Sequence, residues 1–267
     1  NLFTLGGSAG TSPAAPPNLF TLGGSAGTSP AAPPNPLRHL EARLLLAVGR
    51  SLHRADREAE AAETLLRAAE LAARLDDEGY EPRVISLLLL GFILPGLGRP
   101  DEAVVALDEV IQRCEEHGDW MHLGAALNNR ALLRAKQGDL DGMLADFTRT
   151  LQLGRELGHA ALELGGEFNL AEHLYWMDDP DAAEPHAKAA AAVAMRMTGG
   201  WRPAVVALLE GRLRLYRGDD AGALSVAGEI RAQQEAARAR GEGDGALSPS
   251  EDVLCAMIEL AARDAGD

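Results

Sequence analysis

The hydrophobic positions of this chain form a pattern that occurs five times: an apolar helix that carries a small residue, a turn seven residues after that residue, and a second helix. The spacing between successive small residues is 42, 40, 40 and 40 residues. A nearly fixed period in this range is typical of stacked supersecondary units rather than of one globular core. The five small residues are Gly49, Gly91, Ala131, Ala171 and Gly211.

Two further features of each period predict a tight helical hairpin. A small residue midway along the first helix lets the second helix approach its backbone, and an alanine twelve positions later, replaced by Met143 in the third copy, allows the same approach from the other side. Between these positions lie turn residues that end the first helix and cap the second. The turns fall at Asp56, Gly98, Gly138, Asp178 and Gly218.

Segments 98–103 and 126–140 look like the signature of the tetratricopeptide repeat (TPR) family, which the chain resembles over about residues 40 to 235. The long period and segment 155–159 are closer to the repeats of kinesin light chain and of bacterial signalling regulators. The resemblance implies an all-α fold, a right-handed superhelix of five TPR-like hairpins with a C-terminal capping helix. We therefore expect the repeats over residues 36–240, a linker and the capping helix over 241–267, and a flexible leader over 1–35. TPR arrays are scaffolds for unrelated partners, so the resemblance does not identify the partner.

The composition suits closely packed Ala and Leu helices, because 46% of the residues are hydrophobic and only 4% are aromatic. The net charge of −15 argues against nucleic acid as the main partner, since phosphate backbones require clustered Lys and Arg. Only two lysines occur beside many arginines, which indicates a GC-rich bacterial genome.

The two cysteines, Cys114 and Cys255, show no paired spacing and are expected to be reduced and buried, which favours a cytoplasmic protein. The apolar run Val84–Leu94 is interrupted by Pro95 and is shorter than the roughly 20 residues that a membrane span requires, so we expect no membrane insertion. The N-terminus lacks a basic region and an unbroken apolar stretch, so no secretory signal is predicted. Because the chain begins with Asn1 rather than Met, we expect a fragment of a longer protein.

Residues 1–17 are repeated without change as residues 18–34. Most of each copy is rich in Gly, Ser, Ala and Pro and is expected to be flexible, but its head carries a short apolar cluster, the form of a linear recognition motif. Three interpretations stay open: a linker without specific contacts, a Leu-Phe-x-Leu peptide that docks on a TPR surface of this chain or of another copy, or an unrelated tag. An unchanged copy indicates recent duplication or engineering. The apolar residues are Leu2, Phe3, Leu5, Leu19, Phe20 and Leu22.

By analogy with the TPR family, the first helix of each repeat lines the concave face, and its exposed positions are candidates for binding an extended peptide. Asn129 and Asn169 occupy equivalent positions, and their amides either form a ladder that binds the backbone of a peptide or bond neighbouring helices. Aromatic residues of the fourth and fifth repeats either form a pocket for a leader phenylalanine or belong to the core. The candidates are Phe92, Asn128, Asn129, Lys136, Phe168, Asn169, Tyr175, Trp176, Arg212 and Tyr216.

Arg130 and Arg134 stand where the family has apolar residues. Two arginines four positions apart lie on one helix face, where they either hold a carboxylate or belong to an exposed edge with local ion pairs.

The sequence contains no recognisable catalytic constellation. The seven histidines lack metal-ligand spacing, no glycine-rich phosphate loop follows a strand, and no nucleophile lies in a recognisable elbow. We therefore predict a non-catalytic scaffold, without metal or cofactor, that binds a protein or peptide partner carrying an apolar Leu-Phe-x-Leu motif. The alternative is a regulatory or oligomerisation segment of a larger bacterial signalling enzyme or transcriptional regulator.

Overall fold

A computed structural model of the chain describes residues 37–75, 77–197, 203–239 and 248–264, and these residues form helices and connecting turns without a strand. They divide into two compact units whose boundary lies between Asp146 and Phe147, inside one helix. We call them the N-terminal and C-terminal units and describe each by itself. The predicted all-α fold class is confirmed for the described residues. The leader, with its Leu-Phe-x-Leu motifs, lies outside them.

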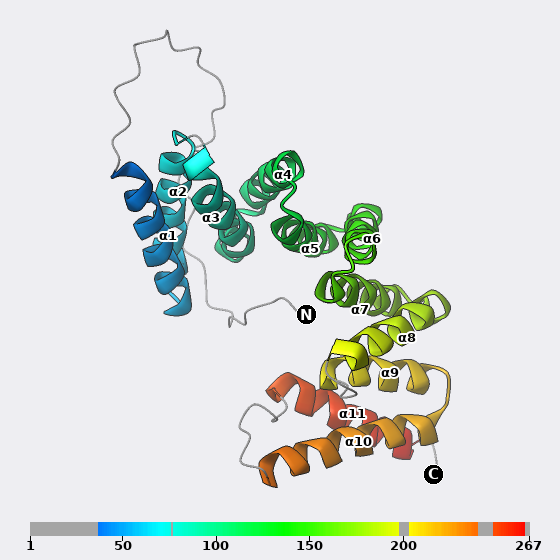
Figure 1. Cartoon of the computed structure of the whole chain (residues 1–267). Helices are drawn as coiled ribbons and strands as arrows, with labels where there is room; N and C mark the ends of the chain where they lie inside the picture. Colours follow the sequence, from blue (N-terminus) through cyan, green and yellow to red (C-terminus); the bar gives the residue numbers. More distant parts are fainter. Residues whose placement is uncertain (1–36, 76, 198–202, 240–247, 265–267) are drawn as a thin grey trace. The chain divides into compact units, whose positions relative to one another are not determined.

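The described residues of the N-terminal unit form five α-helices, two short 3-10 helices and the first part of a sixth α-helix (Figure 1). Each helix packs on the next, α1 on α2, α2 on α3, α3 on α4 and α4 on α5, and α3 also contacts α1 and α5. The elements are α1 (Arg38–Arg54), α2 (Glu58–Ala72), the 3-10 helix η1 (Asp77–Gly79), α3 (Tyr80–Ile93), the 3-10 helix η2 (Leu94–Leu97), α4 (Pro100–His117), α5 (Trp120–Gln137) and the start of α6 (Leu140–Glu156).

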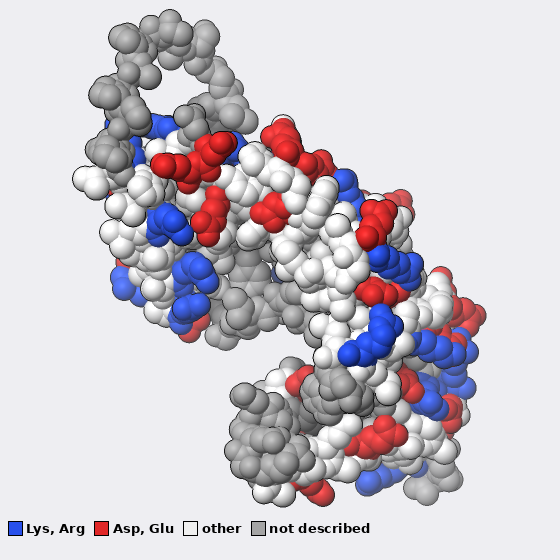
Figure 2. Space-filling model, viewed as in Figure 1, with Lys and Arg blue, Asp and Glu red and all other residues white. Residues whose placement is uncertain are grey.

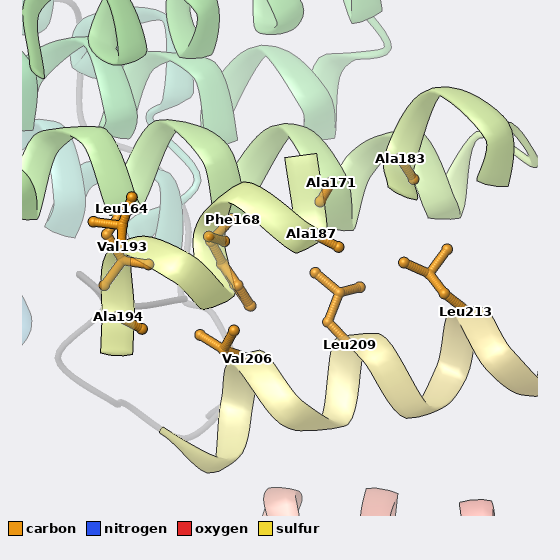
Figure 3. Packing of buried hydrophobic residues seen from close by; sticks show 11 residues of the cluster. Leu164, Phe168, Ala171, Ala183, Ala187, Val193, Ala194, Val206, Leu209 and Leu213 are labelled. Atoms are coloured by element: carbon orange, nitrogen blue, oxygen red, sulfur yellow. The ribbon is translucent and has the colours of Figure 1, made fainter. Parts of the chain in front are cut away.

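The part of the C-terminal unit that the structure describes contains the rest of α6 and five further helices. Helix α7 packs on α8, α8 on α9, α9 on α10, and the final helix α11 covers both α9 and α10. One apolar cluster joins α7, α8 and α9 (Figure 3), and a second joins α9, α10 and α11. The helices are α7 (Ala160–Trp176), α8 (Pro180–Met197), α9 (Ala204–Tyr216), α10 (Asp220–Ala239) and α11 (Pro249–Asp264).

The five predicted hairpins correspond to α1/α2, α3/α4, α5/α6, α7/α8 and α9/α10, and Gly49 and Gly91 lie at close helix crossings as expected. A Cβ atom on Gly49 would lie 2.7 Å from side-chain atoms of Leu65, and one on Gly91 would lie 2.5 Å from those of Leu107. Both distances are shorter than ordinary van der Waals contacts, so a Cβ at either helix crossing would require the leucine side chain to shift. The matching residues of the second helices are fully buried: Ala61, Ala103, Met143, Ala183 and Ala223.

The five predicted turns share one backbone conformation. Each has a positive φ, between 56° and 81°, which closes the first helix in the left-handed region. Three of the turns use glycine, whereas Asp56 and Asp178 adopt this conformation with a side chain. The aspartates that follow the turns at Gly138, Asp178 and Gly218 cap the second helices, because their carboxylates accept hydrogen bonds from backbone N–H groups three residues later. The three capping residues are Asp139, Asp179 and Asp219.

Helix α3 and its flanking 3-10 turns form a longer apolar stretch than the sequence pattern predicted. The helical stretch Asp77–Leu97 runs through Pro95, and among the described residues it is the one stretch of sufficient length and apolarity to cross a membrane. Half of its apolar window is buried inside the unit. Val84, Leu87 and Leu90 are buried, and α3 contacts α1, α2, α4 and α5. The stretch therefore has the contacts of a core helix.

Candidate functional site

Three aromatic side chains of the C-terminal unit meet where α7 and α9 end. The ring centroids of Tyr175 and Trp176 are 5.6 Å apart, and those of Tyr175 and Tyr216 are 6.2 Å apart, both with edge-to-face geometry. Trp176 is 65% exposed and Tyr216 is 50% exposed, whereas Tyr175 is half-buried between them. The structure thus brings together three of the four aromatic candidates of the fourth and fifth repeats.

Arg212 of α9 lies within this aromatic cluster. Its guanidinium carbon is 5.2 Å from the centroid of the Tyr175 ring and 5.5 Å from that of Trp176, which are cation–π distances. Nη2 donates a hydrogen bond to Oε1 of Glu172 at 3.2 Å, and the side chain is only 10% exposed. Its Nε is buried and has no hydrogen-bond partner among the described residues. Arg212 therefore holds the rings while one of its donors is unused.

Tyr216 is fixed from the other side by the turn after α7. Its hydroxyl donates to Oδ1 of Asp178 at 2.5 Å, and this bond raises the pKa of the Tyr216 phenol. Asp178 is one of the two turn residues that adopt a positive φ without being glycine. An aspartate at this turn supplies an acceptor that glycine would lack, so an exposed ring is held in place. We call Tyr175, Trp176, Arg212 and Tyr216 the aromatic face.

Phe168 does not belong to the aromatic face, and its expected exposure was wrong. It is fully buried in the cluster that joins α7, α8 and α9, and Figure 3 shows its ring pointing toward Val206 of α9. Helix α7 is covered on more than one side, so that residues 164–171 are all buried. The alternative interpretation, that an aromatic residue belongs to the core, is correct for Phe168.

The asparagines are also less accessible than expected. Asn128 is 3% exposed and Asn169 is 1% exposed, whereas Asn129 is half-buried. Asn129 belongs to the N-terminal unit and Asn169 to the C-terminal unit. A buried amide does not reach an extended ligand on the surface. The expectation that Asn128 is exposed was therefore wrong, and the burial of Asn169 favours the alternative interpretation of its amide, a bond to neighbouring helices.

The two remaining candidates lie in the N-terminal unit. Phe92 is half-buried and packs edge-to-face on His53, with 5.7 Å between the ring centroids. Lys136 is exposed in the last turn of α5. Neither is in the unit that carries the aromatic face.

The arginine pair of α5 holds a carboxylate that belongs to the chain itself. Arg130 binds both oxygens of Asp146, at 2.9 and 2.7 Å, and Arg134 donates to the same carboxylate at 2.9 Å. Arg130 also donates to Asp108 at 2.6 Å. Burial lowers the pKa of Arg130, but its bonds to the two aspartates outweigh this effect and raise the pKa above its ordinary value. Arg130 and Arg134 therefore already bind an internal carboxylate, that of Asp146.

Sequence reasoning missed several polar partners. Glu167 of α7 is 1% exposed and accepts a bond from Arg155 at 2.5 Å, and Nδ1 of His186 lies 2.7 Å from its other oxygen. Glu172 and Asp178 were not proposed as partners of Arg212 and Tyr216. A signal was available, because these partners are 40 and 38 residues apart, and Tyr80 and Asp119 of the N-terminal unit, which also bond, are 39 apart. Residues one period apart lie side by side in stacked repeats.

The described residues contain no group of three or more His, Cys, Asp or Glu side chains that could hold a metal ion. Both cysteines are free and buried. Burial raises the pKa of the Cys114 thiol to about 11, which makes it unreactive at neutral pH. Within the described part of the chain, the candidate site thus consists of exposed aromatic rings that are held by packing and hydrogen bonds.

Comparison with known proteins gives a likeness in fold. No family model matches the chain, and no curated protein matches it in sequence. Among 23 solved chains with a similar structure is aspartyl phosphate phosphatase F from Bacillus subtilis, with a TM-score of 0.62 and 13% sequence identity. The match covers 86% of this chain and 61% of that structure, so the chain spans less than two thirds of its length. The likeness supports a helical repeat fold.

Proposed function

We propose that this chain is a non-catalytic interaction scaffold of the TPR type that binds an extended peptide on the aromatic face. The observation that carries the proposal is the pair of exposed rings, Trp176 and Tyr216, held by Arg212 and Asp178. Aromatic and arginine side chains supply most of the binding energy in many interfaces. Rings that are already fixed lose little side-chain entropy when a ligand covers them.

The charge balance of Arg212 supports a neutral ligand. The Nε atom of Arg212 is buried, so a ligand on the surface does not reach that donor. Glu172 already balances the charge of Arg212 through its 3.2 Å bond. A neutral, apolar peptide segment therefore fits the aromatic face better than a second carboxylate does.

The proposed ligand is the apolar head of the leader, Asn-Leu-Phe-Thr-Leu-Gly-Gly, which occurs twice in the chain. It carries no charge, and its phenylalanine matches the exposed rings of the aromatic face. The leader binds the aromatic face of its own chain or that of a second copy, or it is an engineered ligand fused to the repeats. Tethering provides an effective concentration in the millimolar range, which is sufficient to occupy a weak site.

The experiment uses the full chain with Phe3→Ser and Phe20→Ser, so that its own leader does not compete. A labelled Asn-Leu-Phe-Thr-Leu-Gly-Gly peptide is titrated to millimolar concentration and followed by fluorescence anisotropy. We expect binding that weakens at least tenfold in Trp176→Ala and Tyr216→Ala. Trp120→Ala is the matched control, because Trp120 is also exposed but lies in the N-terminal unit. Absence of binding refutes the leader as ligand, and binding that survives both substitutions refutes the site.

A second candidate function is a regulatory segment of a longer signalling protein. The supporting observation is that the similar solved structure extends well beyond the part that this chain matches. That structure bears the name of a phosphatase, whereas we propose that this chain has no catalytic activity of its own. Release of phosphate from acetyl phosphate by the purified chain would contradict this part of the proposal.

The proposed setting is the bacterial cytoplasm. The two buried, free thiols support a reducing compartment. Fractionation of cells that express the protein, with antibody detection of the soluble and membrane fractions, tests the location.

A further inference from the structure

The first and last described helices each expose an apolar stripe. Four residues at the start of the N-terminal unit are 42 to 64% exposed, and three residues of α11 are 58 to 62% exposed. Their spacing of three or four positions places each set on one side of its helix. The head stripe consists of Leu37, Leu40, Leu44 and Val48, and the tail stripe consists of Val253, Met257 and Leu260.

Each of these helices is apolar on two opposite sides. The inner side of α1 is buried against α2 and α3, and the inner side of α11 is buried against α9 and α10. The stripes lie on the outer sides, where no other described helix makes substantial contact. Terminal units of repeat arrays usually have a polar outer side, which keeps the array soluble. Two exposed apolar sides therefore indicate that both helices are covered by another surface.

The charges of the two helices are complementary. Helix α1 carries four arginines and one glutamate, a net charge of +3, and α11 carries four acidic residues and one arginine, a net charge of −3. Figure 2 shows several Lys and Arg side chains over α1. Arg38, Arg50 and Arg54 form no ion pair with the described residues, so α1 presents unpaired positive charge. On α11, Asp252 and Glu259 bind Arg231 of α10, which neutralises part of its negative charge.

This charge distribution discriminates between possible pairings. Contact between the head stripes of two copies would bring two positive helices together, and contact between two tail stripes would bring two negative helices together. Contact between a head and a tail joins opposite charges and buries both stripes. Electrostatic complementarity of this kind selects the partner and the register more than it adds affinity.

We propose that α1 of one copy packs on α11 of a second copy, so that the chain associates head to tail. Such a contact is heterologous, and each copy in a pair keeps one free head or one free tail. Seven apolar side chains make a small interface, so we expect weak association, on the order of tens of micromolar or weaker. The inference does not depend on peptide binding, because neither stripe includes the aromatic face.

Sedimentation equilibrium of the full chain tests the proposal. A head variant carries Leu40→Ser and Leu44→Ser, and a tail variant carries Val253→Ser and Met257→Ser. All four side chains are exposed and serine adds no charge, so the fold is expected to persist, as circular dichroism will verify. Val105→Ser, an exposed apolar residue of α4, is the matched control and should associate like the natural sequence.

The expected results differ between head-to-tail and symmetric contacts. The natural sequence associates as its concentration rises, and each variant alone loses at least tenfold in affinity. An equimolar mixture of the two variants recovers a one-to-one dimer and stops there, because it contains one intact head and one intact tail. A monomeric natural sequence at several hundred micromolar overturns the proposal. So does a variant that still associates by itself, or a mixture that remains monomeric.

Discussion

Phe168 and Trp176 lie eight residues apart on α7, and truncation of each should have opposite effects on stability and binding. Phe168 is fully buried between α7, α8 and α9, whereas Trp176 is 65% exposed. Phe→Ala substitutions in cores cost about 3 to 5 kcal/mol, because transfer free energy is lost and a cavity remains. The neighbours of Phe168 lie on three separate helices (Figure 3), so we expect little collapse and a value near 4 kcal/mol.

Urea unfolding followed by circular dichroism measures this loss. With a urea dependence of about 2 kcal/mol per molar, Phe168→Ala should lower the unfolding midpoint by about 2 M. Hydrogen exchange of fragments from α7 and α9 assigns the loss to the C-terminal unit. Trp176→Ala should lower the stability by less than about 1 kcal/mol, the value of an exposed cation–π contact, while it weakens peptide binding.

The matched variant Phe168→Leu keeps most of the core volume and should lower the stability by a smaller amount than Phe168→Ala. A midpoint that shifts by less than about 0.3 M in Phe168→Ala refutes the assignment of this residue to the core. If Trp176→Ala unfolds the C-terminal unit instead, the aromatic face is structural and the proposed binding role loses its support.

Two further predictions concern backbone strain and pH. Replacement of Asp56 by Gly relieves the cost of a positive φ and should stabilise the chain by about 0.5 kcal/mol. Asp178→Gly also removes the acceptor of the Tyr216 hydroxyl and should stabilise the chain less. Thermal unfolding of both variants compares the two effects, and a lower stability of Asp56→Gly would contradict the idea that Asp56 is strained. Burial raises the pKa of Cys114 to about 11, above its value of about 8.5 in the unfolded chain. The contribution of the Cys114 thiol to the free energy of unfolding is therefore fully present below pH about 8.5 and is lost as the pH rises toward 11. Cys114→Ala should flatten this part of the stability profile, and an unchanged profile would show that other groups cause the loss.

The hairpins were predictable because their signal is local. One helix crossing is predicted by three positions: a glycine, a left-handed turn seven residues after the glycine, and an alanine twelve residues after the glycine. Gly91, Gly98 and Ala103 are an example. The same local logic predicted that residues of the turns cap the second helices. The pattern repeats with little change, so a wrong assignment of helix or turn in one repeat is corrected by comparison with the other repeats.

Exposure on the first helices was harder to predict. Helix α7 packs on neighbours from more than one side, so a single apolar stripe does not separate its core from its surface. Phe168 and Tyr175 have similar chemistry, but the first lies where α8 and α9 meet and the second lies where α7 ends. The same packing buries Asn169. Only the position along the helix and the neighbours of the next repeat distinguish these residues.

The order of helix contacts has a consequence for the synthesis of the protein. Within each unit, an α-helix makes its substantial contacts with the next α-helix or the one after it. Chains dominated by such local contacts fold in microseconds to milliseconds. A ribosome that adds about 5 to 20 residues per second needs about 2 to 8 s for one 40-residue period. Each hairpin therefore has time to fold before the following one emerges, and the side that faces the next hairpin stays exposed for seconds until that hairpin covers it.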